Sequence, residues 1–270
     1  MHQVCVPFFY FSTMEYGIAN LAIAPLRAQP KHASEQVSQL LFGETFEIME
    51  RHENWLRVIT AFDGYEGWLN ELQFASIGAE TYGRLSQIKV VTTRTFTTRT
   101  FATAALKEAD NSIIYLPFGS TLPFFENGKI KVGDDAFTVD TQGDVDTMLE
   151  IAYSFINTPY LWGGRTHFGI DCSGFAQAVM RTQGVNLRRD AWQQAEQGQI
   201  VDFLQSATLG DLAFFDNDEG RITHVGIMLN NEMIIHASGK VKIDQIDGQG
   251  IYSAEQKKYT HKLRIIKRYL

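Results

Sequence analysis

One stretch near the middle of the chain constrains its fold more than any other. Residues 159–164 read PYLWGG, an apolar and aromatic turn with two glycines, and residues 171–175 follow as DCSGF. Apolar residues then recur at helical spacing until Gly184, a residue type that commonly ends a helix, so the sequence predicts a helix here. Asp171 is the expected N-cap, which places Cys172 in the first turn. The free N–H groups and the dipole of a helix start favour the thiolate, the form that attacks carbonyls.

Two histidines downstream complete the pattern of a nucleophile with its base. Residues 223–229 and 232–237 predict two strands joined through a pair of asparagines. In a hairpin centred on residue 230, His224 and His236 pair directly on one face. This requires a loop of three or five residues, or a bulge, because a two-residue turn would send His236 to the opposite face. A cysteine beside a base that a third group orients is an activated nucleophile. A solitary cysteine or histidine is more often structural, but the combination favours catalysis.

Five ordered motifs make a resemblance specific. After PYLWGG and DCSGF come LRRD at 187–190, GDLAFF at 210–215 and THVG at 223–226. In this order they resemble the NlpC/P60 cysteine peptidases, which cleave bacterial cell-wall peptides, over residues 144–270. The resemblance implies a papain-like α+β domain in which Cys172 is the nucleophile, His224 the general base and His236 the residue that orients it. It also implies that the Tyr160 hydroxyl reaches toward the nucleophile, with an aromatic wall as the alternative.

The N-terminal half predicts short strands separated by turns. Within residues 16–78, an Asn-Trp strand at Trp55 and a Gly-Trp strand at Trp68 flank a turn and resemble bacterial SH3 (SH3b) domains. Barrel core or rim is the alternative role for both tryptophans. Residues 79–142 predict a second, degenerate SH3-like barrel with a helix around 102–110, or else a β-rich spacer without a ligand.

The expected fold class is therefore α+β: a papain-like NlpC/P60 catalytic domain preceded by two small SH3-like β-barrels. The expected divisions are an N-terminal extension at 1–15, an SH3b domain at 16–78, a degenerate SH3b-like domain at 79–142 and the catalytic domain at 143–270.

The combination of domains resembles the γ-D-glutamyl-L-diamino-acid endopeptidases of murein-peptide recycling. In those enzymes, acidic and polar residues hold a free L-alanine amine, and an SH3b loop closes the pocket. The resemblance implies a substrate site made of Tyr160, Asp171, Ser173 and Asp190 from the catalytic domain, with Glu35, Tyr65 and Trp68 from the SH3b domain. Helix capping is the alternative for Asp171 and Asp190, and a first-turn position is the alternative for Ser173.

Three other functions stay open at this point. The first is a wall hydrolase acting on intact peptidoglycan with SH3b wall-binding modules. The second is a non-catalytic binding protein with a vestigial triad, and the third is a cysteine acyltransferase of related fold. An intact set of one cysteine and two histidines favours the peptidase.

Composition limits the partners. The net charge of −7 argues against nucleic acid and against docking on an anionic membrane or wall polymer, and it favours no partner by itself. The resemblance implies a murein peptide as the substrate, and a monomer is expected. Cys5 and Cys172 do not suggest a disulfide framework. Cys172 with the two histidines could nominally bind a metal, but the resemblance disfavours zinc, and no cofactor is expected.

The beginning of the chain bears on its location. Residues 4–11 are apolar, but this run is too short for a membrane span and lacks the basic start of a secretory signal. Met14 is an alternative translation start. The expected location is cytoplasmic.

Overall fold

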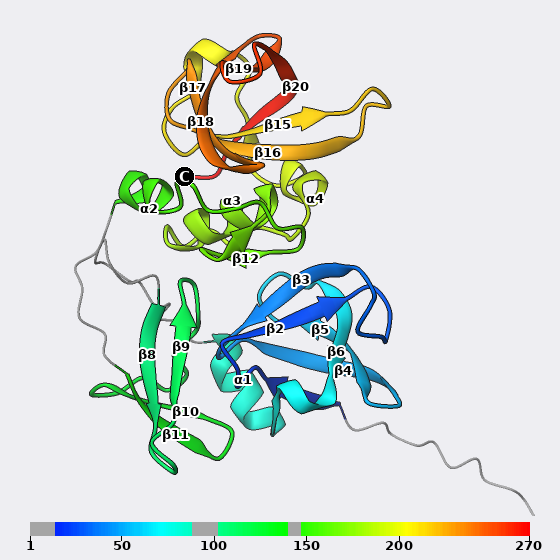
Figure 1. Cartoon of the computed structure of the whole chain (residues 1–270), viewed down its shortest axis with the longest axis vertical. Coiled ribbons are helices and arrows are strands. Elements are labelled where there is room, and N and C mark those ends of the chain that lie inside the picture. Colours follow the sequence, from blue (N-terminus) through cyan, green and yellow to red (C-terminus); the bar gives the residue numbers. More distant parts are fainter. Residues whose placement is uncertain (1–13, 88–101, 140–146) are drawn as a thin grey trace, which may run out of the picture.

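The computed structural model describes residues 14–87, 102–139 and 147–270, which form three parts (Figure 1). Helices α2 to α4 lie between the C-terminal strands and the two N-terminal sheets. Two predicted features lie outside the described residues. These are most of the N-terminal extension and the domain boundary between residues 142 and 143.

The N-terminal part is one antiparallel sheet that curls around its own core. Its strand order is β3-β2-β6-β5-β4-β1-β7. Trp55 is 7% exposed, so its alternative role as core is confirmed. The elements are β1 (Glu15–Ile18), β2 (Ile23–Arg27), β3 (Gln36–Leu41), β4 (Thr45–His52), β5 (Trp55–Thr60), β6 (Glu66–Asn70), the 3-10 turn Glu71–Gln73, β7 (Ala75–Ile77) and α1 (Ala79–Gln87).

The second part is a four-stranded antiparallel sheet in the order β10-β11-β8-β9, with β8 (Ala102–Lys107), β9 (Ile113–Pro117), β10 (Lys129–Val132) and β11 (Asp135–Val139). The predicted helix around 102–110 is wrong. Thr103 and Ala105 are buried and Leu106 is exposed, so the segment alternates with the period of a strand paired on both sides. Phe137 meets Phe42 of the first sheet edge to face, so the two sheets share a core. A second SH3-like barrel stays a prediction.

The third part combines helices with a barrel. Strand order β14-β20-β15-β16-β17-β18-β19, together with a β19–β20 pairing, closes six antiparallel strands into a barrel. The elements are α2 (Met148–Ser154), β12 (Arg165–Thr166), β13 (Gly169–Ile170), α3 (Cys172–Arg181), α4 (Ala191–Ala195), β14 (Gln199–Ile200), the 3-10 turn Leu204–Ser206, β15 (Leu212–Asp216), β16 (Ile222–Met228), β17 (Met233–Ser238), β18 (Lys240–Asp247), β19 (Gly250–Ser253) and β20 (Lys258–Arg268).

Two cores flank the strands of this barrel. Along β15, Leu212 and Phe214 join the core beneath the helices, whereas Ala213 and Phe215 join a separate core on the other strand face. The alternation follows from the two-residue period of a strand. Helix α2 begins at a capping box between Thr147 and Glu150, which satisfies its first backbone donors.

A buried charge cluster joins the first and third parts. Arg165 donates to Glu44 through Nη1 at 2.7 Å and through Nη2 at 2.9 Å, and Arg181 donates to the same carboxylate at 2.7 Å. All three side chains are nearly inaccessible to solvent. The ring of Phe62 lies against both guanidinium groups, which adds cation–π attraction. The cluster fixes the SH3-like part against helix α3.

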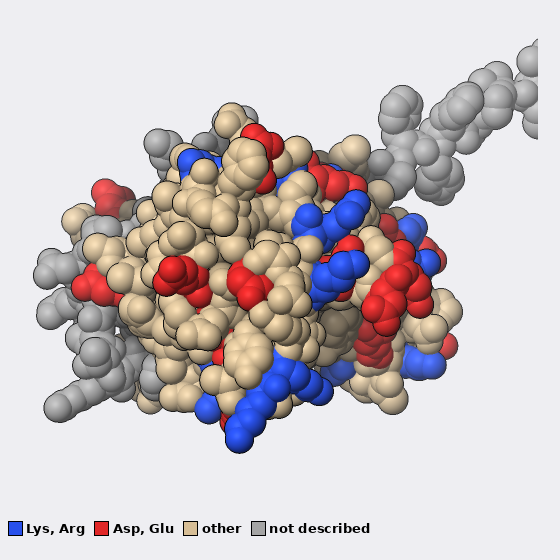
Figure 2. Space-filling view, turned by 90° about the horizontal axis from the view of Figure 1, so that it is seen from above, with Lys and Arg blue, Asp and Glu red and all other residues tan. Residues whose placement is uncertain are grey.

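The surface carries charges of both signs. On the face seen in Figure 2, lysine and arginine side chains are interspersed with acidic side chains and uncharged surface. Within the described ranges, no helix combines the length and apolar character that crossing a membrane requires.

Candidate active site

The nucleophile candidate lies at the start of α3, as the sequence predicts. Asp171 is the N-cap, and its Oδ1 accepts a hydrogen bond of 2.7 Å from the backbone N–H of Gly174. Cys172 is the first helical residue and is 5% exposed. Its thiol is free.

The electrostatic expectation for this thiol is wrong. Burial and then the charge of Asp171 raise the pKa of Cys172 to about 12. The backbone N–H groups of Val225 and Ser173 and the charge of Arg189 act in the opposite direction and are outweighed. In this state burial prevails over the helix start, so the thiol is neutral at physiological pH.

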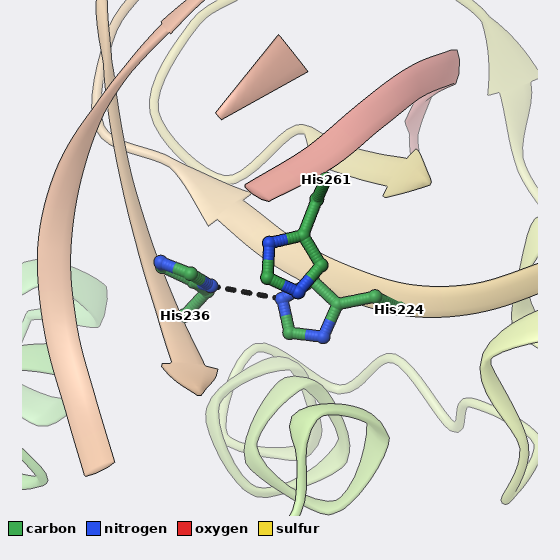
Figure 3. Close-up of side chains that lie close together, drawn as sticks. All are labelled: His224, His236 and His261. Carbon is green, nitrogen blue, oxygen red and sulfur yellow. Dashed lines mark hydrogen bonds between the residues drawn. The ribbon is translucent and has the colours of Figure 1, made fainter. Parts of the chain in front are cut away.

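Two imidazoles and a carboxylate form a chain that begins at His224, the residue before Val225, whose backbone N–H contacts the thiol. His224 Nε2 lies 2.8 Å from His236 Nδ1 (Figure 3), and His236 Nε2 lies 3.1 Å from Asp244 Oδ2. Burial raises the pKa of Asp244, but the hydrogen bond with His236 and the interactions with Lys242 outweigh burial. Together they hold the pKa below its usual value. Asp244 is therefore an ionised acceptor.

This chain fixes the tautomers. Because a carboxylate only accepts, His236 must donate from Nε2, and a neutral His236 then accepts at Nδ1. His224 consequently donates from Nε2 and keeps the lone pair on Nδ1, the nitrogen that points away from His236 (Figure 3). Burial, then His261 and His236, lower the pKa of His224 well below its usual value, so it is neutral. A neutral imidazole with a free lone pair can act as a base.

The hairpin reaches this geometry by a register different from the one expected. His236 pairs with Gly226 rather than with His224, so the hairpin is centred on residue 231. The strands end at Met228 and Met233 and are closed by a Leu229–Met233 backbone hydrogen bond, leaving a three-residue loop. The predicted odd-numbered loop is confirmed. Because the error is two residues, both histidines stay on one face.

Asp171 is surrounded by donors. Its Oδ1 also accepts from Ser173 Oγ at 3.2 Å and from Arg189 Nη1 at 3.0 Å, and its Oδ2 accepts from the backbone N–H of Gly163 at 2.9 Å. Arg189 forms an ion pair with it, donates to Ser173 Oγ at 2.7 Å and donates to Ser38 Oγ at 3.0 Å. The carboxylate therefore organises the nucleophile loop, in keeping with its capping role.

The second carboxylate of this region belongs to Asp190, which meets the SH3-like part. It is the N-cap residue of α4, and the Tyr65 hydroxyl from the SH3-like part lies 3.3 and 3.4 Å from its two oxygens. Burial raises the pKa of Asp190, while Arg189 and the Tyr65 hydrogen bond oppose the shift. Burial, followed by Cys172 and Asp171, raises the pKa of Tyr160, which places that hydroxyl in the electrostatic field of the nucleophile.

A third contact joins Glu35 to the PYLWGG turn. Trp162 Nε1 donates to Glu35 Oε1 at 2.7 Å, and Gln36 Nε2 donates to the Trp162 carbonyl at 3.1 Å. Trp162 itself is 58% exposed. The structure places Glu35 against this turn, where it meets Trp162, and its predicted part in the substrate site stays a prediction. Trp68 instead lies edge to face against His52 within its own sheet.

Four residues of this region carry no sequence signal of their own. Asp244 lies in a strand with an ordinary alternating pattern. Arg189 lies in the LRRD motif and Trp162 in the PYLWGG turn, but neither motif by itself indicates what the side chain contacts. His261 stacks on His224 with ring centroids 4.1 Å apart, although 37 positions separate the two residues in the sequence. Only the fold brings these side chains together.

Two family models match the chain. Residues 157–263 match the NlpC/P60 family, and residues 26–73 match the bacterial dipeptidyl-peptidase Sh3 domain. The first match contains Cys172, His224, His236 and Asp244, and the second contains Glu35 and Tyr65.

Characterised relatives extend over most of the chain. A gamma-D-glutamyl-L-lysine dipeptidyl-peptidase of Bacillus subtilis (strain 168) is 30% identical over 223 residues, covering 74% of this chain and 71% of that protein. Dipeptidyl-peptidase 6 of Lysinibacillus sphaericus is 28% identical over 254 residues, covering 84% and 90%. An NlpC/P60 family crystal structure from Bacillus cereus ATCC 10987 superposes with a TM-score of 0.74 at 18% identity, covering 94% of this chain and 99% of that one. The last likeness shows the fold.

Proposed function

Because the chain belongs to the NlpC/P60 family of cysteine peptidases, we propose that it hydrolyses the bond between γ-D-glutamate and an L-diamino acid in cell-wall peptides with a free N-terminal L-alanine. The family and the relatives support a peptidase acting on peptides of peptidoglycan. The requirement for a free N-terminus is the finer proposal. It rests mainly on one observation, the contact of SH3-like residues with the nucleophile loop and with Asp190.

The reaction follows from the chain of hydrogen bonds. His224 Nδ1 takes the proton from Cys172, and the thiolate attacks the γ-carbonyl carbon of D-glutamate. The backbone N–H at the start of α3 stabilises the developing oxyanion. The protonated His224 then gives its proton to the leaving amine of the diamino acid. Water attacks the resulting thioester, with His224 again the base, and restores the thiol.

The neighbouring dyad of His236 and Asp244 keeps His224 in the tautomer that this sequence needs. His236 orients the base, and Asp244 orients His236. The imidazolium that forms on His224 lies one imidazole away from a carboxylate, which stabilises the positive charge.

The free amine has two carboxylates within the proposed site. Asp171 is committed to Arg189 and to three other donors, so we assign the ammonium to Asp190, with Tyr65 beside it, and to Glu35. Trp162, which is exposed, contacts Glu35, and we assign Trp68 no part because its ring packs on His52. Ser173 contributes by holding Arg189 in place. A peptide that continues beyond L-alanine would leave these carboxylates covered and without a cation.

The test compares L-Ala-γ-D-Glu-L-Lys with its N-acetyl form at equal concentration. Losing a desolvated charge pair costs about 3–5 kcal/mol, so acetylation should lower kcat/KM by roughly a hundredfold to a few thousandfold. Cys172→Ala should hydrolyse neither peptide. Similar kcat/KM for the two peptides would instead favour the second candidate, a wall hydrolase acting on intact peptidoglycan.

A paired set of variants locates the effect. Asp190→Asn and Glu35→Gln should each shrink the ratio between the free and acetylated peptides, because they remove a charge that recognises the ammonium. Trp68→Phe is the matched control, since this ring packs on His52, and it should leave the ratio unchanged. We further propose that the enzyme acts as a cytoplasmic monomer on peptides already released from the wall.

A further inference from the structure

A third histidine beside the imidazole chain creates a donor set that the proposed reaction does not use. The side chains of His224, His236 and His261 each offer one nitrogen, and these nitrogens all lie within 4.8 Å of one another. Figure 3 shows a ring nitrogen of His261 directed toward the hydrogen bond between the other two. We propose that these three histidines bind a zinc ion and that bound zinc inhibits the peptidase.

The donor spacing of His224 and His236 fits a zinc ion with little movement, and His261 must approach them by about an ångström. Zinc binds histidine nitrogen at roughly 2.0–2.1 Å, so two nitrogens on one tetrahedral ion stand about 3.4 Å apart. His224 Nε2 and His236 Nδ1 are already 2.8 Å apart because they share a proton. Replacing that proton with the metal requires them to separate by only about half an ångström. Three imidazoles suit zinc and leave a fourth position for water.

Partners behind the ligands already favour this arrangement. A histidine that binds a metal usually holds its other ring nitrogen in a hydrogen bond. His236 Nε2 is held by Asp244. His261 Nδ1 lies 2.8 Å from Thr260 Oγ1, so His261 Nε2 is the nitrogen that can bind the metal. Lys242 Nζ lies 3.2 Å from the Asp244 carboxylate and offsets part of its charge. The imidazoles, rather than a net negative charge, must therefore supply the affinity.

The burial of the three histidines indicates the side from which zinc reaches the site. His236 is fully buried and His224 is 6% exposed, whereas His261 is only partly buried on β20. The ion would thus arrive from the β20 side. When a metal binds His224 Nε2, the proton of the neutral ring moves to Nδ1, so that Nδ1 has no lone pair and cannot accept the Cys172 proton. The inhibition rests on the proposed function, but the binding does not.

Binding is tested directly by titrating metal-free protein with zinc by calorimetry. Cys172→Ala should bind one zinc per chain as tightly as the wild type, because the thiol is not a ligand. His261→Phe keeps an aromatic ring stacked on His224 but removes the nitrogen. It should bind zinc at least tenfold to a hundredfold more weakly, because losing even a residue that hydrogen-bonds to a metal ligand has about that effect. Cobalt(II) should give a tetrahedral spectrum without a sulfur-to-metal band. Unchanged zinc affinity in His261→Phe, or loss of binding in Cys172→Ala, would overturn the site.

Inhibition is measured separately, with each variant compared with its own metal-free rate. Zinc should inhibit the wild type, EDTA should restore the rate, and His261→Phe should need at least about tenfold more zinc for the same inhibition. Equal sensitivity of the two proteins would overturn the inhibitory role. If the protein hydrolysed no wall peptide, the proposed function would fail while the calorimetric result on Cys172→Ala still decided the metal site.

Discussion

At the scale of single residues, Cys172 and His224 have pKa shifts of opposite sign. Burial raises the pKa of the thiol to about 12 and lowers that of the imidazole, so both groups are neutral before a substrate arrives. A raised thiol pKa moves thiolate formation to higher pH. We therefore expect iodoacetamide to alkylate Cys172 slowly near about pH 6 and progressively faster toward about pH 9, measured as the second-order rate at each pH.

Cys172→Ala provides the control for the second cysteine of the chain, because any adduct on that variant lies elsewhere. A fast rate that stayed flat across the acidic range would indicate a preformed thiolate–imidazolium pair. That result would contradict the neutral resting state.

Asp244 is a positioning residue, since it acts through His236. Asp244→Ala removes the acceptor that fixes both tautomers, and we expect kcat to fall about tenfold to a hundredfold, the usual effect of a partner that orients a histidine, with KM little changed. Lys242→Met is the matched variant, because it removes the cation next to Asp244 but leaves the carboxylate in place. Its kcat should stay near the wild type.

The pH profile separates positioning from simple structural damage. In Asp244→Ala, the imidazolium on His224 loses its nearby carboxylate, so the acidic limb of the kcat profile should move to lower pH. A lower kcat with an unmoved limb, or an equal loss in Lys242→Met, would argue against this role.

Single residues also show how far the sequence predicts the site. Cys172, His224 and His236 were predictable because a cap, a helix period and a strand period each restrict where a side chain points. Asp244 and Arg189 were not, because their roles depend on which side chain lies opposite in space. Trp162 was not predictable either, because its contact with Glu35 joins residues 127 positions apart.

At the scale of elements, the β16–β17 hairpin shows which property of a strand pair is predictable. The same-face relation of the two histidines depends only on whether the loop length is odd or even, and this was correct. The pairing itself was displaced by two residues, since Asn230 accepts from the N–H groups of Glu232 and Met233 and places the turn one residue later than expected. Local hydrogen bonds of this kind are not visible in a hydrophobic pattern.

The glycines of two turns give an element-scale prediction. Gly163 has a φ of +74°, and a Cβ there would lie 2.6 Å from the Gln36 carbonyl oxygen, whereas Gly184 has a φ of +80° and open space around it. Alanine at either position costs about 1–2 kcal/mol for the left-handed backbone. Only Gly163→Ala should also push the SH3-like strand β3 away from the nucleophile loop.

Thermal unfolding and kcat/KM for the free and the acetylated tripeptide distinguish the two variants. Gly184→Ala should lose stability but retain activity, whereas Gly163→Ala should lose stability and discriminate poorly between free and acetylated peptides. Equal behaviour of the two variants would mean that the contact of Gly163 with Gln36 does not hold the site together.

At the scale of the whole molecule, Glu44 is the charge on which the joint between the domains depends. Burial raises its pKa, but the charges of Arg165 and Arg181 overcome this and lower it below its usual value. Glu44→Gln leaves two buried guanidinium groups short of a counter-charge and should cost about 3–5 kcal/mol in the free energy of unfolding. Glu66→Gln, which removes a partner of the exposed Arg57, should change stability little.

The same cluster predicts a pH dependence with a definite sign. A carboxyl whose pKa is lower in the folded state stabilises the fold above its unfolded pKa, and this stability is lost as the pH falls through the folded value. Denaturation in urea across the acidic range should therefore show a steeper loss for the wild type than for Glu44→Gln. Parallel curves would exclude Glu44 as the source.

The sequence predicts the individual domains better than it predicts how they contact one another. The catalytic and SH3-like parts followed from motifs, whereas the helix around 102–110 was wrong because its alanines are good helix formers that pair as a strand in this context. The contacts between parts join residues more than a hundred positions apart, for which a single sequence carries no pattern.

The two arginines that meet Glu44 follow it in the chain by 121 and 137 residues. A lineage that loses the carboxylate must also change both distant positions, or it inherits a fold with unmatched charge in its interior. We therefore expect these three positions to change together between family members. Gene fusions that exchange the front half of one family member for that of another should survive only where both parents carry the same three residues.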